Sequence, residues 1–168
     1  EGDYSSAFGW ANDALGEFSN AFGTLNRASG EESSAFGYRN TSSGLRSTAM
    51  GADSTAGADF SLAIGNSNDA ATGARVAAGA TNGIAIGRNA AVAETGINAI
   101  AMGSSSAASG LRSTAIGTFS AAAAQDSVAI GNAAAAVDGS RVGAGATNGI
   151  AIGRRANVAD NAANALAL

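Results

Sequence analysis

The chain has 168 residues and a net charge of −4, with 24 glycines, no proline, and neither cysteine nor histidine. This composition excludes disulfides, thiolate or histidine metal sites and histidine-based catalysis, and the negative charge argues against nucleic-acid binding. Alanine supplies much of the apolar fraction and buries little area, so a compact globule is not expected. No apolar run reaches the length of a membrane helix. We therefore expect no cofactor, no metal and no direct membrane insertion by this segment.

The first predicted elements are short strands within a recurring tetrad, x-Ala-Φ-Gly, in which Φ is a larger apolar residue. The first copy is Ser6-Ala7-Phe8-Gly9, and the glycines of the next copies stand at 23, 37, 51 and 65, at a period of 14 residues. Because side chains alternate along a strand, x and Φ share one face and Ala takes the other. The glycine ends the strand, and a small residue seven positions later marks a second turn.

Each unit thus predicts two short strands and two tight turns, and stacked units form an all-β solenoid of about eleven 14-residue coils. The recurring Ala indicates a thin interior. Asn12, Asn26 and Asn40 recur in the first turn and either bond to one another along the stack or only tolerate turn dihedrals.

The period is interrupted after Gly65. Val76-Ala77-Ala78-Gly79 keeps the register as a weak tetrad, the strong tetrad Ile84–Gly87 ends eight residues later, and the next one ends after a further 16. The period of 14 then resumes at Gly117, Gly131 and Gly145 before the interruption recurs.

The segment AGATNGIAIGR stands at 78–88 and again at 144–154, which indicates an internal module of 66 residues, about 37–102 and 103–168. Each module has ten residues more than four plain coils, placed around Thr81-Asn82-Gly83 and Thr147-Asn148-Gly149. Asn-Gly favours a tight turn, so a reversal or a bulge is expected there. A neck, a strand insertion and a lengthened coil are all compatible with the pattern.

The Φ residues form an apolar row that points outward if Ala fills the interior. An exposed row of this length marks an interface, and symmetric self-association would bury it, so we predict an obligate homo-oligomer. The candidates for its core are Phe8, Phe22, Phe36, Met50, Ile64, Ile86, Met102, Ile116, Ile130 and Ile152.

The tetrads Leu62–Gly65, Ile84–Gly87 and Val128–Gly131 resemble the haemagglutinin-type, YadA-like head repeats of trimeric autotransporter adhesins, and the resemblance covers nearly the whole chain. It implies a left-handed parallel β-roll with three chains intertwined in a homotrimer. It also implies a single repetitive head domain, 1–168, excised from a longer bacterial surface protein with a C-terminal outer-membrane anchor outside this chain. The implied function is attachment to host cells or extracellular matrix proteins. Phe in the first three tetrads departs from the Val or Ile common in the family.

Residues 1–60 contain eight of the nine aromatic and eight of the thirteen acidic residues, so this end is the candidate for host contact. Trp10 and Tyr38 directly follow a tetrad glycine and could project from a turn, whereas the three Phe at Φ fill a wider core. Arg46 and Arg112, equivalent in the 66-residue module, could bind matrix or sulfated polysaccharide. The structural alternative for them is an ion pair across a subunit boundary.

The carboxylates are scattered without a close pair, so we predict no catalytic site and no enzyme. An ice-binding solenoid or a purely structural spacer is the alternative function. Ice-binding faces need aligned threonine rows, and Thr48 and Thr114 stand nearly alone. An acyltransferase of the left-handed β-helix type is disfavoured, because its repeat is a hexapeptide and it uses histidine.

Overall fold

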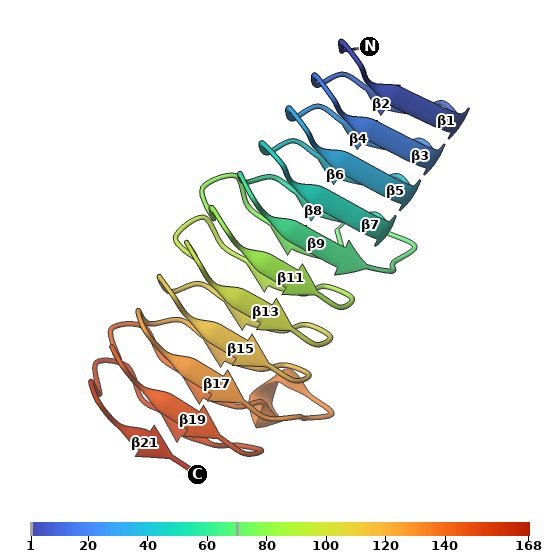
Figure 1. Cartoon of the computed structure of the whole chain (residues 1–168). Helices are drawn as coiled ribbons and strands as arrows, with labels where there is room; N and C mark the ends of the chain where they lie inside the picture. Colours follow the sequence, from blue (N-terminus) through green and yellow to red (C-terminus); the bar gives the residue numbers. More distant parts are fainter. Residues whose placement is uncertain (1, 70) are drawn as a thin grey trace.

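The computed structural model describes residues 2–69 and 71–168, and it shows one rod of stacked parallel coils with the chain termini at opposite ends (Figure 1). Within these residues the odd-numbered strands form an eleven-stranded sheet and the even-numbered strands form a ten-stranded sheet. Every pairing is parallel, because each coil returns the chain to the same place one layer along. The prediction of an all-β parallel solenoid is confirmed.

The odd sheet contains β1 (Ser6–Trp10), β3 (Asn20–Thr24), β5 (Ser34–Tyr38), β7 (Thr48–Ala52), β9 (Leu62–Gly65), β11 (Ile84–Ile86), β13 (Ile100–Met102), β15 (Thr114–Ile116), β17 (Val128–Ile130), β19 (Ile150–Ile152) and β21 (Leu166–Ala167). The even sheet contains β2 (Asp13–Ala14), β4 (Arg27–Ala28), β6 (Thr41–Ser42), β8 (Thr55–Ala56), β10 (Arg75–Val76), β12 (Ala91–Val92), β14 (Ala107–Ala108), β16 (Ala121–Ala122), β18 (Arg141–Val142) and β20 (Asn157–Val158). A short 3-10 helix, η1 (Ala136–Asp138), lies between β17 and β18.

The interior is a thin layer of small side chains. Each tetrad alanine from Ala21 to Ala151 is fully buried, and it faces the second residue of an even strand, which is Ala, Ser or Val. Only Ala7 of the first coil is exposed, because no coil covers that end. Small side chains let the two sheets approach closely, and the predicted alanine interior is therefore correct.

Each coil has a first turn, from an odd to an even strand, and a second turn, from an even to the next odd strand. In the plain coils a non-glycine residue with positive φ stands at each turn, every seven residues; the first three after Tyr4 are Ala11, Phe18 and Leu25. Their amides bond the previous coil, as when the Phe18 N–H donates to the Asp3 carbonyl at 2.9 Å. The sequence predicted the glycine and the small residue of the two turns, but not these non-glycine corners with a left-handed backbone.

The small residue at the second turn is required for close approach rather than for its dihedral angles. A Cβ added at Gly30 would lie 2.1 Å from the carbonyl oxygen of Gly44 in the next coil. Alanine takes this place at Ala58 and Ala124, where the following coil is a longer one. The coil-to-coil spacing therefore selects glycine wherever two plain coils stack.

The coils are not uniform in length, which corrects the prediction of plain 14-residue coils. Register pairs Ile64 with Ile86 and Ile130 with Ile152, two steps of 22 residues, and each is followed by a step of 16, as from Ile86 to Met102. With a partial turn before β1, where the Gly2 N–H donates to the Ala14 carbonyl, the rod has about 12 turns, slightly more than predicted.

Two expectations about the interruptions were wrong. Val76–Gly79 is no tetrad, because Val76 belongs to β10 of the even sheet, and Gly145 likewise follows β18 in a second turn. The Asn-Gly pairs do not reverse the chain: β11 and β19 continue in parallel, so the lengthened coil is the correct alternative. Most of the added length lies in the first turn, between β9 and β10 and between β17 and β18, and both segments protrude from one side of the rod (Figure 1).

The asparagines of the first turn form a ladder along the stack. Asn26 Nδ2 donates to Asn12 Oδ1 at 3.0 Å, and Asn40 Nδ2 donates to Asn26 Oδ1 at 3.0 Å. Asn26 and Asn40 are buried, and the left-handed backbone belongs to the residues before them. The side-chain ladder, not turn tolerance, is therefore the role of these residues.

Candidate functional site

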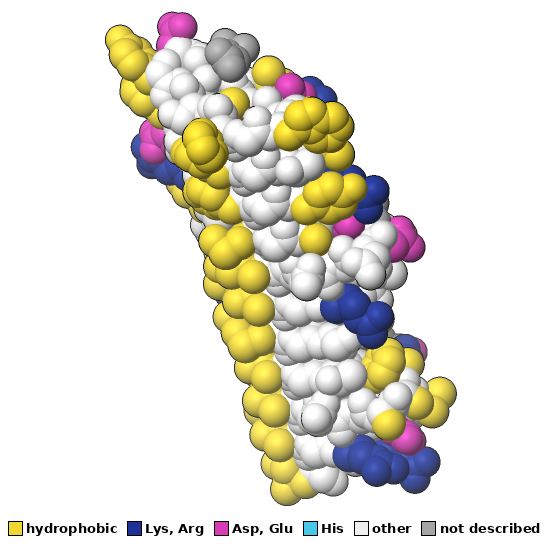
Figure 2. All heavy atoms as spheres, turned by 90° about the vertical axis from the view of Figure 1, so that its right-hand side faces the viewer, with side chains coloured by type: hydrophobic (Ala, Val, Ile, Leu, Met, Phe, Trp, Pro, Cys, Tyr) yellow, Lys and Arg dark blue, Asp and Glu magenta, His cyan; other side chains and the backbone are white. Residues whose placement is uncertain are grey.

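The outward side of the odd sheet is an exposed apolar face, formed by the x and Φ residues of the tetrads. Figure 2 shows hydrophobic side chains in a continuous row along the length of the rod. Phe8 is 73% exposed, and Met50 and Ile152 are about two-fifths exposed at 41% and 42%. All ten predicted core candidates lie on this face, half-buried or exposed: Phe8, Phe22, Phe36, Met50, Ile64, Ile86, Met102, Ile116, Ile130 and Ile152. Their burial in a trimer stays a prediction.

The apolar face changes composition along the rod. In the first four coils x is polar, and Φ is Phe in the first three and Met50 in the fourth. The Phe22 and Phe36 rings stack, with centroids 5.5 Å apart and near-parallel planes. From β9 onward x is mostly Leu, Ile or Val, as at Leu62 and Ile84, so two apolar columns run side by side. The wide ring at Φ thus compensates for the polar x.

The first-turn edge holds the two aromatic ligand candidates. Trp10 and Tyr38 occupy the same register column two coils apart, with Thr24 between them, and are 67% and 43% exposed. The Arg39 guanidinium lies 4.9 Å from the Tyr38 ring centroid and pairs with the buried Asp53 carboxylate, with Nη2 donating to Oδ2 at 2.8 Å. This hydrogen bond raises the pKa of Arg39. Both aromatic side chains are exposed, but they belong to the last residues of β1 and β5 and not to the turn itself.

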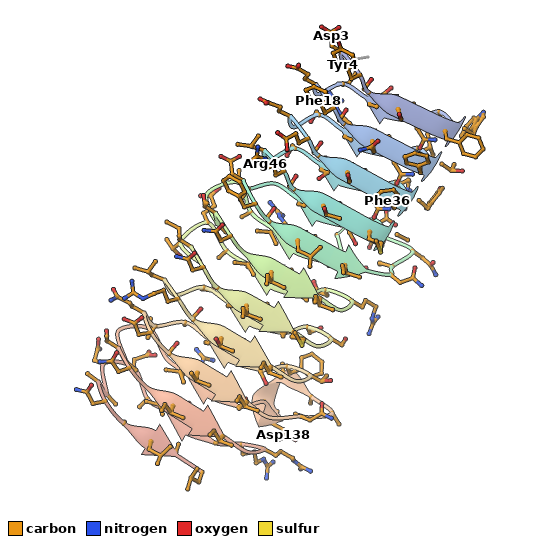
Figure 3. The ribbon with its side chains drawn as sticks, viewed as in Figure 1. Asp3, Tyr4, Phe18, Phe36, Arg46 and Asp138 are labelled. Carbon is orange, nitrogen blue, oxygen red and sulfur yellow. The ribbon has the colours of Figure 1, made fainter. Side chains whose placement is uncertain are left out.

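The second-turn edge carries a column of corner residues that interact pairwise across neighbouring coils. Tyr4 stacks on Phe18 with centroids 5.2 Å apart and ring planes 7° from parallel (Figure 3). Farther along, the Asn82 amide donates to the Asn98 amide oxygen at 2.9 Å, and Asn148 does the same to Asn164. In each pair, side chains of the same kind, two aromatic rings or two amides, interact between neighbouring coils.

The ligand candidates Arg46 and Arg112 belong to this column. Arg46 binds Glu32 through Nε and Nη2, at 2.7 and 2.9 Å, and Arg112 binds Asp126 in the same bidentate way, with Nη2 to Oδ2 at 2.7 Å. Both partners come from the same chain, so the expected pairing across a subunit boundary is not needed. The bonds to the guanidinium lower the pKa of Glu32 and lower the pKa of Asp126 to about 2.

A further polar cluster surrounds η1 and contains Asp138 (Figure 3). Asp138 pairs with Arg155, and its Oδ2 lies 3.7 Å from Arg154 Nη2. Beside it is an open hollow of about 730 Å³ that also includes Arg141 and Asp160. The charges are mixed and close to balanced, and the arrangement favours no single ligand.

The described residues contain no group of three or more metal-ligating side chains and no helix long and apolar enough to cross a membrane. The candidate sites of the described residues are an exposed apolar face and the side chains along the two turn edges. The geometry suits protein–protein contact.

A comparison with protein families finds a match to the repeated coils. The family model described as "YadA head domain repeat (2 copies)" matches residues 14–40, 28–54, 42–68 and 95–120. Most of the matched residues lie in plain coils, but the match at 42–68 includes the first three residues after β9, and the match at 95–120 begins in the longer turn after β12. No match reaches the protruding segment after β17. No curated protein matches the chain.

Proposed function

Because the chain is a YadA-type head domain, belonging to that family through repeats matched between residues 14 and 120, we propose that it is the adhesive head of a bacterial surface protein. In this proposal the head attaches the cell to host cells or to extracellular matrix proteins. A C-terminal region outside the chain anchors it in the outer membrane. The whole of 1–168 acts as one repetitive, non-enzymatic head.

The observation that supports this best is the exposed apolar face. A row of Phe, Met and Ile along the whole rod is unfavourable in water, and contiguous patches of this kind mark association surfaces. We assign the face to the centre of a homotrimer of left-handed rolls, in which the ten Φ candidates meet around one axis. The two turn edges then stay available for a ligand.

Within this head we assign host contact first to Trp10 and Tyr38. They are exposed aromatic side chains on one edge, and aromatic residues of this kind dominate binding energies. Arg46 and Arg112 rank second, because their guanidinium groups already bind Glu32 and Asp126. The ice-binding alternative gains no support, since the outward threonines Thr41 and Thr55 of the even sheet are followed by Arg75.

The test is binding of the folded protein to immobilised collagen, fibronectin and laminin. A Trp10→Ala/Tyr38→Ala variant should lose binding at least about tenfold, the scale of one hot spot, with its solution mass unchanged. Val137→Ala, which removes another exposed apolar side chain, is the matched control and should bind normally. An assembled wild type that binds no matrix or host-cell protein would instead indicate a spacer.

A further inference from the structure

The N-terminal part of the second-turn edge combines two surface features. Asp3, Glu17 and Glu31 stand in one column, each directly before a corner residue, and all three are exposed. Next to them lies the Tyr4–Phe18 stack, with the rings 81% and 47% exposed. Figure 3 shows Asp3, Tyr4 and Phe18 projecting from this end of the rod. We call these five residues the acidic aromatic ridge.

The same molecule shows what such groups bind when a cation is present. On the first-turn edge, Arg39 lies over the Tyr38 ring and pairs with Asp53, so that an aromatic face and a carboxylate hold one guanidinium. The ridge has the aromatic face and the carboxylates, but no salt bridge in the described chain involves Asp3, Glu17 or Glu31.

The arginine in this corner column among residues 1–60 forms no salt bridge with these carboxylates. Arg46 lies in the corner column and is held by Glu32 through two hydrogen bonds. Residues 1–60 contain eight acidic residues and three arginines, so the local charge stays negative. Phe18 and Glu32 also line an open hollow of about 450 Å³ at the surface, wide enough for a long cationic side chain.

We propose that the acidic aromatic ridge binds a lysine- or arginine-rich segment of a partner protein. The cationic groups would lie over the Tyr4 and Phe18 rings, which attract them through the ring quadrupole, while the carboxylates neutralise their charge. Carboxylates repeated once per coil, at about 4.8 Å, attract a partner with several cations better than one with a single cation. The proposal deepens the proposed adhesive function and rests on it for the existence of a protein partner.

The probe is a fluorescein-labelled octalysine peptide, titrated with the folded protein and followed by anisotropy at low and moderate salt. A Glu17→Gln/Glu31→Gln variant should weaken binding on the order of tenfold, and Tyr4→Ala/Phe18→Ala on the order of fivefold at unchanged charge. The matched control is Glu94→Gln/Asp160→Asn, which removes two exposed carboxylates elsewhere on the rod and should have little effect.

Three results would overturn the proposal: equal weakening by the control, which means general electrostatics; full binding by the aromatic variant; or no binding by the wild type. Matrix binding by the same proteins separates this proposal from the adhesive function. A wild type that binds octalysine through the ridge but no matrix or host-cell protein contradicts adhesion and retains the site. A wild type that binds matrix but not octalysine retains adhesion and contradicts the site.

Discussion

Between β1 and β9 every coil has 14 residues, whereas between β9 and β21 the coils have 14, 16 or 22. In the first region the inward residue of the even strands is Ala or Ser, and asparagines join the first turns of the first three coils, with Ser54 at the same position in the fourth. In the second region Val replaces the small residue in four even strands, and Ser or Ala takes the place of the ladder asparagines. Both regions nevertheless keep the strands in one register.

Coil length and the size of the inward residue therefore change together along the rod. Val76, Val92, Val142 and Val158 are each followed by a second turn two residues longer than that of a plain coil. The longer turn makes room for the larger side chain, and a glycine packs against it: a Cβ at Gly83 would lie 2.7 Å from Val76 Cγ1. The same combination of an inward valine and a longer second turn therefore recurs at all four positions.

In the first region, the substitution Gly30→Ala should lower the free energy of unfolding most. The added Cβ would lie 2.1 Å from the Gly44 carbonyl oxygen, so the coils must separate, which should cost more than about 3 kcal/mol of unfolding free energy. Urea denaturation measures the loss. Ala58→Gly tests the same position before a longer coil and should cost under about 1 kcal/mol. Equal losses would contradict the spacing explanation.

Breaking the amide ladder comes next. Asn26→Ala removes the donor to Asn12 and to the Gly37 carbonyl and the acceptor for Asn40, leaving buried polar groups unpaired, at a cost of about 3 kcal/mol. Asn26→Ser should cost less, because Ser120 of the second region bonds the equivalent carbonyls of Ile116 and Gly131. Denaturation midpoints that rank serine no better than alanine would contradict this assignment.

The coupling of core and turn predicts a smaller, reciprocal effect. Val92→Ala should cost about 2 kcal/mol, from lost burial and the cavity that remains. Ala28→Val, in a plain coil with the shorter turn, should also destabilise, by about 1 to 3 kcal/mol, because the core there is overpacked.

Lengthening the turn after Ala28→Val supplies the matched rescue. Replacing residues 29–33 with the seven-residue turn 93–99 should restore part of the lost stability if turn length makes room for valine. Thermal unfolding of the three variants decides between the alternatives. If the longer turn restores no stability, or destabilises the protein further, turn length does not make room for the larger core residue, and the proposed coupling is wrong.

The smallest expected effect concerns pH. Arg112 lowers the pKa of Asp126 to about 2 from 3.8, so the pair contributes stability above pH 3.8 that is lost as the pH falls toward 2. Asp126→Asn should remove this acid-dependent part. NMR titration of the carboxyl reports the shift directly, and an Asp126 that titrates at its ordinary pKa would show that the ion pair does not form.

Much of the fold could be predicted because the same tetrad recurs along most of the chain and each copy indicates the same strand and turn. Alternation placed Ala inside and Φ outside, and glycine spacing placed the odd strands. The turn corners could not be predicted, since Phe18, Leu25 and Arg39 are poor candidates for a left-handed backbone and adopt it only because inter-coil hydrogen bonds require it.

The longer coils were misassigned for a related reason. A weak tetrad such as Val76–Gly79 looks like an odd strand when glycine alone sets the register. The repeated Arg-Val pair at 75–76 and 141–142 was the available signal, because a larger residue at an inward position indicates a wider coil. For the site, exposure of Trp10 and Tyr38 was predictable, but the pairing of Arg46 and Arg112 depends on which residues stack one coil apart.

If the apolar face is an interface between copies of this chain, as we propose, the solution mass of the folded protein must show it. Multi-angle light scattering should give three times the 16.0 kDa of one chain, with no monomer released on dilution through the micromolar range. A folded particle of 16.0 kDa would contradict the claim, because the row of Phe, Met and Ile would then be stable in water without a partner.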